Sequence, residues 1–316
     1  MSEFIAEKIW PGALIERSIF GTDDARAIWA QVLDACPDAV ECFAFEVSVG
    51  ARLGLRLRDG SRIALKVHVG RDGPRFLGAV QRVQQHLWER GFPCPKPLGS
   101  RERVTLEEWR DDGEYRDAHE PAVRRVIAGQ LTELIRLTGE LQPPPGLEPF
   151  FPPPDAPLWP IPHNVLFDFD ATAEGAEWID EIAGAAKPLR DAQVGQLVIG
   201  HGDWTVKHIR FDGLRPTVIY DWDSLNTDFE TVFVGNAAAT FTYTEHLPVS
   251  VWPTVEEAQA FLDEYEQMRP EPFTSKERAA ARAAAVYSRA YSARCTHAAG
   301  KDAGRMQLRE FADAFL

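Results

Sequence analysis

A short β-ribbon is predicted between residues 203 and 221, and no other segment constrains the fold of this chain as strongly. Residues 208–211 and 217–220 are apolar or β-forming, and the sequence DGLRP between them has the composition of a turn. A hairpin brings the residues before its first strand close to the residues after its second strand. Asp203 and Asp221 are therefore expected to be neighbours, and two carboxylates at one place suit a general base together with a magnesium ligand.

The N-terminal part of the chain has the pattern of a small sheet with one helix inserted. A helical stretch covers residues 23–36, and a second helix is predicted over residues 78–91, where apolar residues recur at helical spacing and Gly91 ends the pattern. Asp59 and Gly60 form a hairpin-turn sequence between two strand-like segments. The strand-like segments cover residues 42–49, 53–60, 61–69 and 103–110.

The remainder of the chain is predicted to be mostly helical. A long amphipathic segment begins at Pro121, and the C-terminal part from about Thr274 is rich in Ala and Arg, which favours helix. Between them, residues 142–162 contain too many prolines for a regular helix or a central strand. This stretch also carries Phe and Trp, so we expect it to pack against the protein surface or to line a groove.

The composition is that of a globular protein, and it disfavours several classes of partner. Hydrophobic residues make up 45% of the 316 residues, and no apolar stretch approaches the length of a membrane-spanning helix. The formal net charge of −14 disfavours nucleic acid and membranes as partners and favours a cationic substrate. The four cysteines lack zinc-type spacing and are expected to be free thiols. The sequence MSEFIAEKIW lacks the order of a signal peptide, so a cytoplasmic location is expected.

Four motifs follow one another in a fixed order along the chain. RDGSRIALKVHVG has a lysine, Lys66, between apolar residues of a strand, and HLWERGFPCPKPL has a helix end, a glycine and a proline-rich turn. VTLEEWRDDG follows as a strand and connection, and HGD, the ribbon and DWD come last. This set resembles the aminoglycoside phosphotransferase and choline kinase family, which shares the protein kinase fold. The resemblance covers roughly residues 45 to 240.

The resemblance implies an α+β, bilobal, protein-kinase-like fold. The small N-terminal lobe, expected over residues 1–109, would contain an antiparallel sheet with one helix and would bind the nucleotide. The larger, mainly helical C-terminal lobe, expected over residues 110–316, would carry catalysis and substrate binding.

The matching positions have roles in phosphoryl transfer in this family, and the resemblance assigns those roles here. Asp203 would be the catalytic base for a substrate hydroxyl, and His201 would brace the catalytic loop by hydrogen bonds. Asp221 would hold Mg²⁺ at the nucleotide phosphates, with Asp223 as a second acidic residue near the metal. Lys66 would pair with the α- and β-phosphates. The implied cofactors are ATP or GTP and Mg²⁺.

One departure from the family pattern lies beside Asp203. His208 stands where relatives have an asparagine that binds a second metal ion, and imidazole is a poor ligand for Mg²⁺. Three roles remain open for His208: a metal ligand, a direct contact to phosphate, or a hydrogen-bonded residue that fills a structural slot. Lys207, next to it, would supply positive charge.

A second departure concerns the helix after Lys66, which lacks the glutamate that orients this lysine in relatives. The helix offers Gln81, Gln84 and Gln85 instead, and a glutamine can hydrogen-bond a lysine without balancing its charge. Gln81 is counted with the nucleotide-binding residues on this ground. Glu107 is counted with them because it lies in the motif that resembles the strand and hinge joining the two lobes.

These motifs lead to one main hypothesis and one alternative. The main hypothesis is a small-molecule O-phosphotransferase that moves the γ-phosphate of ATP or GTP to a hydroxyl of an amino-bearing compound, such as an aminoglycoside or amino sugar. The alternative, suggested by His208 and the missing helix glutamate, is a non-catalytic nucleotide-binding pseudokinase that acts as a scaffold or sensor. Simple turn carboxylates and a surface lysine are the plainer alternatives for the motif residues.

Overall fold

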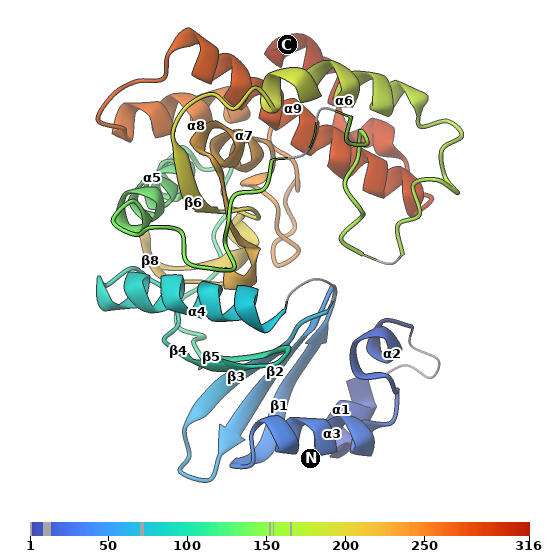
Figure 1. The fold of residues 1–316 in the computed structure, drawn as a ribbon, viewed down its shortest axis with the longest axis vertical. Helices are drawn as coiled ribbons and strands as arrows, with labels where there is room; N and C mark the ends of the chain where they lie inside the picture. The colour runs from blue at the N-terminus through green and yellow to red at the C-terminus, as the bar shows by residue number, and fades with distance from the viewer. Residues whose placement is uncertain (1, 9–13, 70–72, 152, 154, 165) are drawn as a thin grey trace. The chain divides into compact units, whose positions relative to one another are not determined.

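The computed structural model describes residues 2–8, 14–69, 73–151, 153, 155–164 and 166–316. The chain divides into two compact units (Figure 1): Met1–Asp111 with Pro144–Gly146, and Asp112–Pro143 with Leu147–Leu316. The first unit contains an antiparallel sheet and the second is mainly helical. The predicted α+β class is therefore confirmed.

The first unit is built on a five-stranded antiparallel sheet. Asp59 accepts hydrogen bonds from the backbone and the hydroxyl of Ser61, which closes the predicted turn between the second and third strands. The spatial order of the strands is β1-β2-β3-β5-β4. Their bounds are β1 Ala39–Val47, β2 Ala51–Leu57, β3 Arg62–Val67, β4 Pro97–Arg101 and β5 Val104–Glu108.

Helix α4 (Pro74–Glu89) is inserted between β3 and β4, as the sequence pattern predicts. It begins with a proline at its first turn, and Gly91 follows its end with φ +75°, a conformation that favours glycine. Its apolar stripe is buried, but Trp88 is 36% exposed and lies with its ring 4.9 Å from Lys96 Nζ. Trp88 therefore lies at the margin of the predicted apolar face.

Three helices precede the sheet, and only the third was expected. Helix α3 (Ala25–Ala35) confirms the predicted helical stretch, and Asp24 caps it by accepting from the backbone of Ala27. Helices α1 (Ser2–Lys8) and α2 (Leu14–Phe20) also belong to this unit. Apolar residues from all three helices join those of β1, β2 and β3 in one core.

A short piece of the later chain belongs to this first unit. Arg82 of α4 donates to the carbonyl of Pro145 at 3.0 Å. Gly146 has φ +109°, and a Cβ there would lie 2.4 Å from the carbonyl oxygen of Arg75. Only glycine allows the two backbones to approach this closely.

The second unit contains two small β-ribbons among helices. Strands β6 (Leu197–His201) and β9 (Leu225–Phe229) pair with each other, and β7 (Ile209–Asp212) pairs with β8 (Arg215–Ile219). The helices are α5 Pro121–Thr138, α6 Glu177–Arg190, α7 Glu230–Thr240, α8 Val255–Met268, α9 Ser275–Ala298 and α10 Leu308–Phe315. Single 3-10 turns are η1 Val206–His208, η2 Trp222–Ser224 and η3 Ala303–Met306.

Helix α7 lies at the centre of this unit and packs closely on α9 (Figure 1). It is apolar on nearly all sides, as expected for a buried helix. A Cβ at Gly235 would lie 2.2 Å from the carbonyl oxygen of Ala281. The facing side of α9 carries alanines, whose small side chains also allow the two helices to approach closely. The Ala-rich composition of α9 therefore follows from close helix packing.

The proline-rich stretch forms no helix or strand in its described residues. Trp159 packs at 5.4 Å from Tyr287, measured between ring centroids, and its indole donates to Asp180. Phe150 and Ile161 are instead exposed, at 74% and 90%. The stretch thus packs on the helices only in part.

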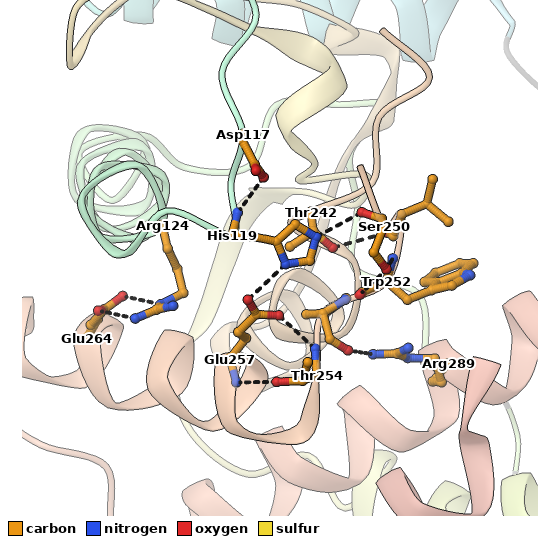
Figure 2. A network of polar contacts seen from close by, with 12 residues as sticks. Asp117, His119, Arg124, Thr242, Ser250, Trp252, Thr254, Glu257, Glu264 and Arg289 are labelled. Atoms are coloured by element: carbon orange, nitrogen blue, oxygen red, sulfur yellow. Dashed lines mark hydrogen bonds and ion pairs between the residues drawn. The ribbon is translucent and has the colours of Figure 1, made fainter. Parts of the chain in front are cut away.

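The segment leading into α5 is attached to the start of α8 through His119 (Figure 2). The imidazole Nδ1 lies 2.8 Å from Glu257 Oε1, and Nε2 lies 2.8 Å from the carbonyl oxygen of Ser250. Glu257 also accepts from the backbone of Thr254 in the capping box of α8. Burial lowers the pKa of His119, but these hydrogen bonds and the charges of Glu257 and Asp117 outweigh burial and raise it overall.

Replacing His119 is expected to make the stability of the protein less dependent on pH. Because the folded-state pKa of His119 is raised, its contribution is fully present below the ordinary imidazole value of about 6.5 and is lost as pH rises through the folded-state value. At low pH, His119→Gln should lower the free energy of unfolding by on the order of 1 kcal/mol. Denaturant titrations over a pH series measure the difference, with His297→Gln as the matched control. A difference that does not change with pH would contradict this role.

All four cysteines are free and buried. Among the described residues, no helix combines the length and apolar character needed to cross a membrane.

Candidate active site

The predicted ribbon folds back and brings Asp203 and Asp221 together. Ile209 of β7 pairs with Ile219 of β8, and the backbone of Tyr220 donates to the carbonyl of His208 at 2.9 Å. One oxygen from each aspartate and one ring nitrogen of His208 all lie within 4.8 Å of one another. The prediction that the two aspartates are neighbours is confirmed.

Asp203 lies in the loop after β6, where one imidazole and one ammonium group face its carboxylate. Its Oδ2 lies 2.9 Å from His208 Nε2 and 3.3 Å from Lys207 Nζ. Burial raises the pKa of Asp203, but the hydrogen bond from His208 and the nearby positive charges outweigh burial and hold the pKa well below its usual range. The side chain keeps 40% exposure, so an ionised carboxylate remains accessible here.

Asp221 has an unusual backbone conformation that orients its carboxylate. Its φ of 69° and ψ of 44° are in the left-handed region, which costs a non-glycine residue about 1–2 kcal/mol. The Ser224 hydroxyl donates to Asp221 Oδ2 at 2.8 Å, and the same oxygen lies 3.8 Å from His208 Nε2. Backbone strain of this kind collects at functional sites, and here it fixes a carboxylate oxygen toward His208.

His201 is buried, and its hydrogen bonds hold the loop that carries Asp203. The backbone N–H of Asp203 donates to His201 Nδ1 at 3.2 Å, so Nε2 carries the proton and donates to the carbonyl of Tyr220 at 3.2 Å. Burial lowers the pKa of His201, which keeps the imidazole neutral. Trp204 and Trp222 are buried and make edge contacts with its ring. These contacts agree with a bracing role and with tryptophans that pack beneath the loop.

The donor set beside the ribbon suits a divalent cation. Two carboxylates and an imidazole converge, and carboxylate oxygens are the ligands that Mg²⁺ and Mn²⁺ prefer in proteins. Asp223 lies on the same turn, η2, but it is not among the three residues whose donor atoms come within 4.8 Å. A metal-binding role for Asp223 stays a prediction.

The lysine of the first unit has an acidic partner that sequence inspection missed. Lys66 Nζ lies 3.9 Å from Glu107 Oε1, and both side chains are largely buried, with 11% and 5% exposure. Gln84 Nε2 donates to Glu107 Oε2 at 3.0 Å. Gln81 points elsewhere, because its Oε1 accepts from the backbone of Gly99 on β4. Pairing of β3 with β5 puts Glu107 and Lys66 on one face of the sheet. Knowledge of this strand order would have identified Glu107 as the partner of Lys66.

Comparison with known proteins places the chain in a family. The model of the phosphotransferase enzyme family matches residues 55–272, which is more than half of the chain. The chain belongs to the phosphotransferase enzyme family. No curated protein sequence matches the chain significantly. The suspected relation to aminoglycoside phosphotransferases and choline kinases is therefore confirmed, and the protein is a small-molecule phosphotransferase with an alcohol group as acceptor.

Solved structures show the same fold at low sequence identity. Amicoumacin kinase hAmiN, in complex with AMP-PNP, Ca²⁺ and Ami, has a TM-score of 0.62 at 10% identity, over 90% of this chain and 92% of that chain. A microcompartment-associated aminopropanol kinase has a TM-score of 0.61 at 14% identity, over 91% and 94%. An ethanolamine kinase of Plasmodium vivax has a TM-score of 0.54 at 11% identity, over 99% and 93%. At these identities the likeness establishes the fold.

In this phosphotransferase, Glu107 is expected to orient Lys66 for the nucleotide. Glu107→Gln removes the charge that faces Lys66 but keeps a partner for Gln84, and breaking a buried ion pair is costly. We expect the KM for the nucleotide to rise about tenfold, equivalent to roughly 1.4 kcal/mol of binding.

Steady-state kinetics at saturating acceptor measure this KM, and the melting temperature of each variant checks its folding. Glu108→Gln, on the next and exposed position of β5, is the matched control. A nucleotide KM unchanged by Glu107→Gln would contradict a role of Glu107 in nucleotide binding.

Proposed function

We propose that the protein transfers the γ-phosphate of ATP or GTP to a hydroxyl group of an amino-bearing small molecule. The observation that carries this proposal is the convergence of Asp203, His208 and Asp221 at the base of the β7–β8 ribbon. The buried pair of Lys66 and Glu107 supports a nucleotide-binding role for the first unit. We propose Lys66 as the residue that pairs with the nucleotide phosphates.

Asp203 is the proposed base, and its low pKa suits this reaction. The carboxylate remains ionised and accepts a hydrogen bond from the attacking hydroxyl, which it orients. Phosphoryl transfer passes through a loose transition state, so positioning matters more than strong basicity. A divalent metal, when bound, would neutralise charge on the phosphates. His201 keeps Asp203 in place through the loop backbone.

Acidic and aromatic groups near Asp203 support an amino-bearing acceptor. Lys207 Nζ, which contacts Asp203, also lies 5.0 Å from the ring centroid of Tyr243. The Tyr243 hydroxyl donates to Glu245 at 2.9 Å, so an exposed carboxylate is linked to the base through Lys207 and Tyr243. The net charge of −14 favours cationic compounds, and the aminopropanol and ethanolamine kinases named above share the fold.

A binding and transfer experiment tests the proposed function. Melting temperatures are measured with ATP and with GTP, each with and without Mg²⁺, and then with a panel of amino alcohols and amino sugars. A ligand at about 100 times its dissociation constant stabilises the folded state by roughly 2.7 kcal/mol, which is a readily measured shift. Compounds that give a shift are then incubated with nucleotide, and ³¹P NMR detects the phosphate ester.

The same experiment separates a kinase from a pseudokinase. Metal-dependent nucleotide binding together with a phosphate ester supports the proposed function. Nucleotide binding that is indifferent to every divalent metal, with no ester from any acceptor, supports the scaffold or sensor alternative. The absence of nucleotide binding would contradict both.

A further inference from the structure

We propose that His208 is a metal ligand in this protein, and that the site therefore prefers Mn²⁺ to Mg²⁺. This inference rests on the proposed function and concerns the metal that the same site binds. The proposed ligands are Nε2 of His208, Oδ2 of Asp221 and Oδ2 of Asp203, whose second oxygen stays available to the substrate hydroxyl.

The spacing of the three donor atoms suits one common cation. His208 Nε2 lies 2.9 Å from Asp203 Oδ2 and 3.8 Å from Asp221 Oδ2. Donors about 2.1 Å from a shared cation lie roughly 3 Å apart when adjacent in an octahedron and about 3.4 Å apart in a tetrahedron. The two separations from His208 bracket these values, and all three donors lie within 4.8 Å of one another, so side-chain rotation can bring them to bonding distance of one cation.

Supporting groups already orient these ligands as ordered metal sites require. The Ser224 hydroxyl binds the Asp221 oxygen that faces His208, and the left-handed backbone of Asp221 directs that carboxylate. The backbone of His208 is fixed by its carbonyl, which accepts from Tyr220, and by its N–H, which donates to Thr205. Such outer contacts commonly fix a ligand's orientation and tune the affinity of a metal site.

The nitrogen ligand sets the metal preference. Mg²⁺ demands oxygen donors in near-ideal octahedral geometry, whereas imidazole suits first-row transition ions. Mn²⁺ accepts both imidazole and carboxylate and also binds phosphate oxygens. Coordination uses the lone pair of Nε2, so the imidazole proton is carried on Nδ1 while Nε2 faces the cation.

Paramagnetic resonance of Mn²⁺ bound to the nucleotide-free protein tests this inference directly. Continuous-wave spectra give the dissociation constant, and competition with Mg²⁺ gives the preference. Pulsed spectra detect coupling to a ¹⁴N nucleus, which requires a directly bound imidazole. The variants are His208→Asn, which restores an amide oxygen donor, and His297→Asn as the matched control outside the site.

The expected result is a ¹⁴N coupling in the wild type and in His297→Asn that disappears in His208→Asn. The Mn²⁺ affinity of His208→Asn should fall about tenfold or more while its Mg²⁺ affinity is retained, because the amide supplies oxygen. No Mn²⁺ binding, no ¹⁴N coupling in the wild type, or a coupling that survives in His208→Asn would overturn the inference. A wild type without the coupling overturns the inference even if a variant fails to fold, and His208→Gln replaces His208→Asn if the asparagine variant does not fold.

Failure of this inference can be told apart from failure of the proposed function. Phosphate ester formation with Mg²⁺, combined with no ¹⁴N coupling, supports the proposed function and contradicts the inference that His208 is a metal ligand. A ¹⁴N coupling without any ester from the acceptor panel leaves the metal ligand in place and removes the proposed reaction.

Discussion

Asp203→Asn is expected to lower kcat about 10³-fold while leaving nucleotide affinity nearly unchanged. The amide keeps the size of the side chain and an oxygen at the position that lies 2.9 Å from His208 Nε2. It cannot accept the proton of the attacking hydroxyl, and positioned base catalysis contributes roughly 10²–10⁴-fold. The loss should therefore appear in kcat, because the interaction is made in the transition state. Single-turnover transfer to an acceptor found in the binding panel measures the effect.

A control for this experiment lies in the same ribbon. Asp212 of β7 has a side chain that is 71% exposed and pairs with Arg215 at 3.1 Å. Asp212→Asn should change neither kcat nor nucleotide affinity, since exposed ion pairs contribute little. Full activity in Asp203→Asn would remove Asp203 from the catalytic role, whatever the behaviour of the control.

Asp221→Asn is the second large expected loss. Removing one carboxylate should lower kcat/KM about 10³-fold, equivalent to roughly 4 kcal/mol of transition-state stabilisation, and should raise the metal concentration needed for activity. Asparagine tolerates left-handed backbone, so the fold should be retained at the φ of 69°. Asp221→Ala should in addition lower the free energy of unfolding by about 1 kcal/mol. Kinetics over a metal titration and denaturant unfolding measure the two effects separately.

Asp223→Asn is the matched control for Asp221→Asn. Both residues lie at the η2 turn, but only Asp221 belongs to the converging donor set. We expect Asp223→Asn to retain most activity at saturating metal. A loss in Asp223→Asn as large as that in Asp221→Asn would show that the metal site extends to Asp223. Equal, unimpaired activity in both variants would contradict a metal site on this turn.

The elements that follow from local chemistry could be predicted from the sequence. The Asp59 turn, the end of α4 at Gly91 and the β7–β8 ribbon depend on turn residues and short apolar periods, which act over a few residues. The closeness of Asp203 and Asp221 followed directly from that ribbon. The phosphotransferase family was also recognisable, because its motifs keep their order along the chain.

The contacts that complete each part of the candidate site were decided by tertiary structure. Glu107 faces Lys66 only because β3 pairs with β5 rather than with β4, and sequence inspection had looked for this partner on the helix. The segment at Gly146 joins the first unit through backbone contacts that local sequence patterns do not encode.

For His208, the sequence supplied the side chain, and the tertiary structure supplied its neighbours. The sequence placed an imidazole five residues after Asp203 and left its role open. The structure directs its Nε2 toward both aspartates, because the ribbon's register and the left-handed backbone of Asp221 fix three side chains from separate segments. Local patterns determine which groups are available, whereas strand pairing and backbone strain determine which of them meet.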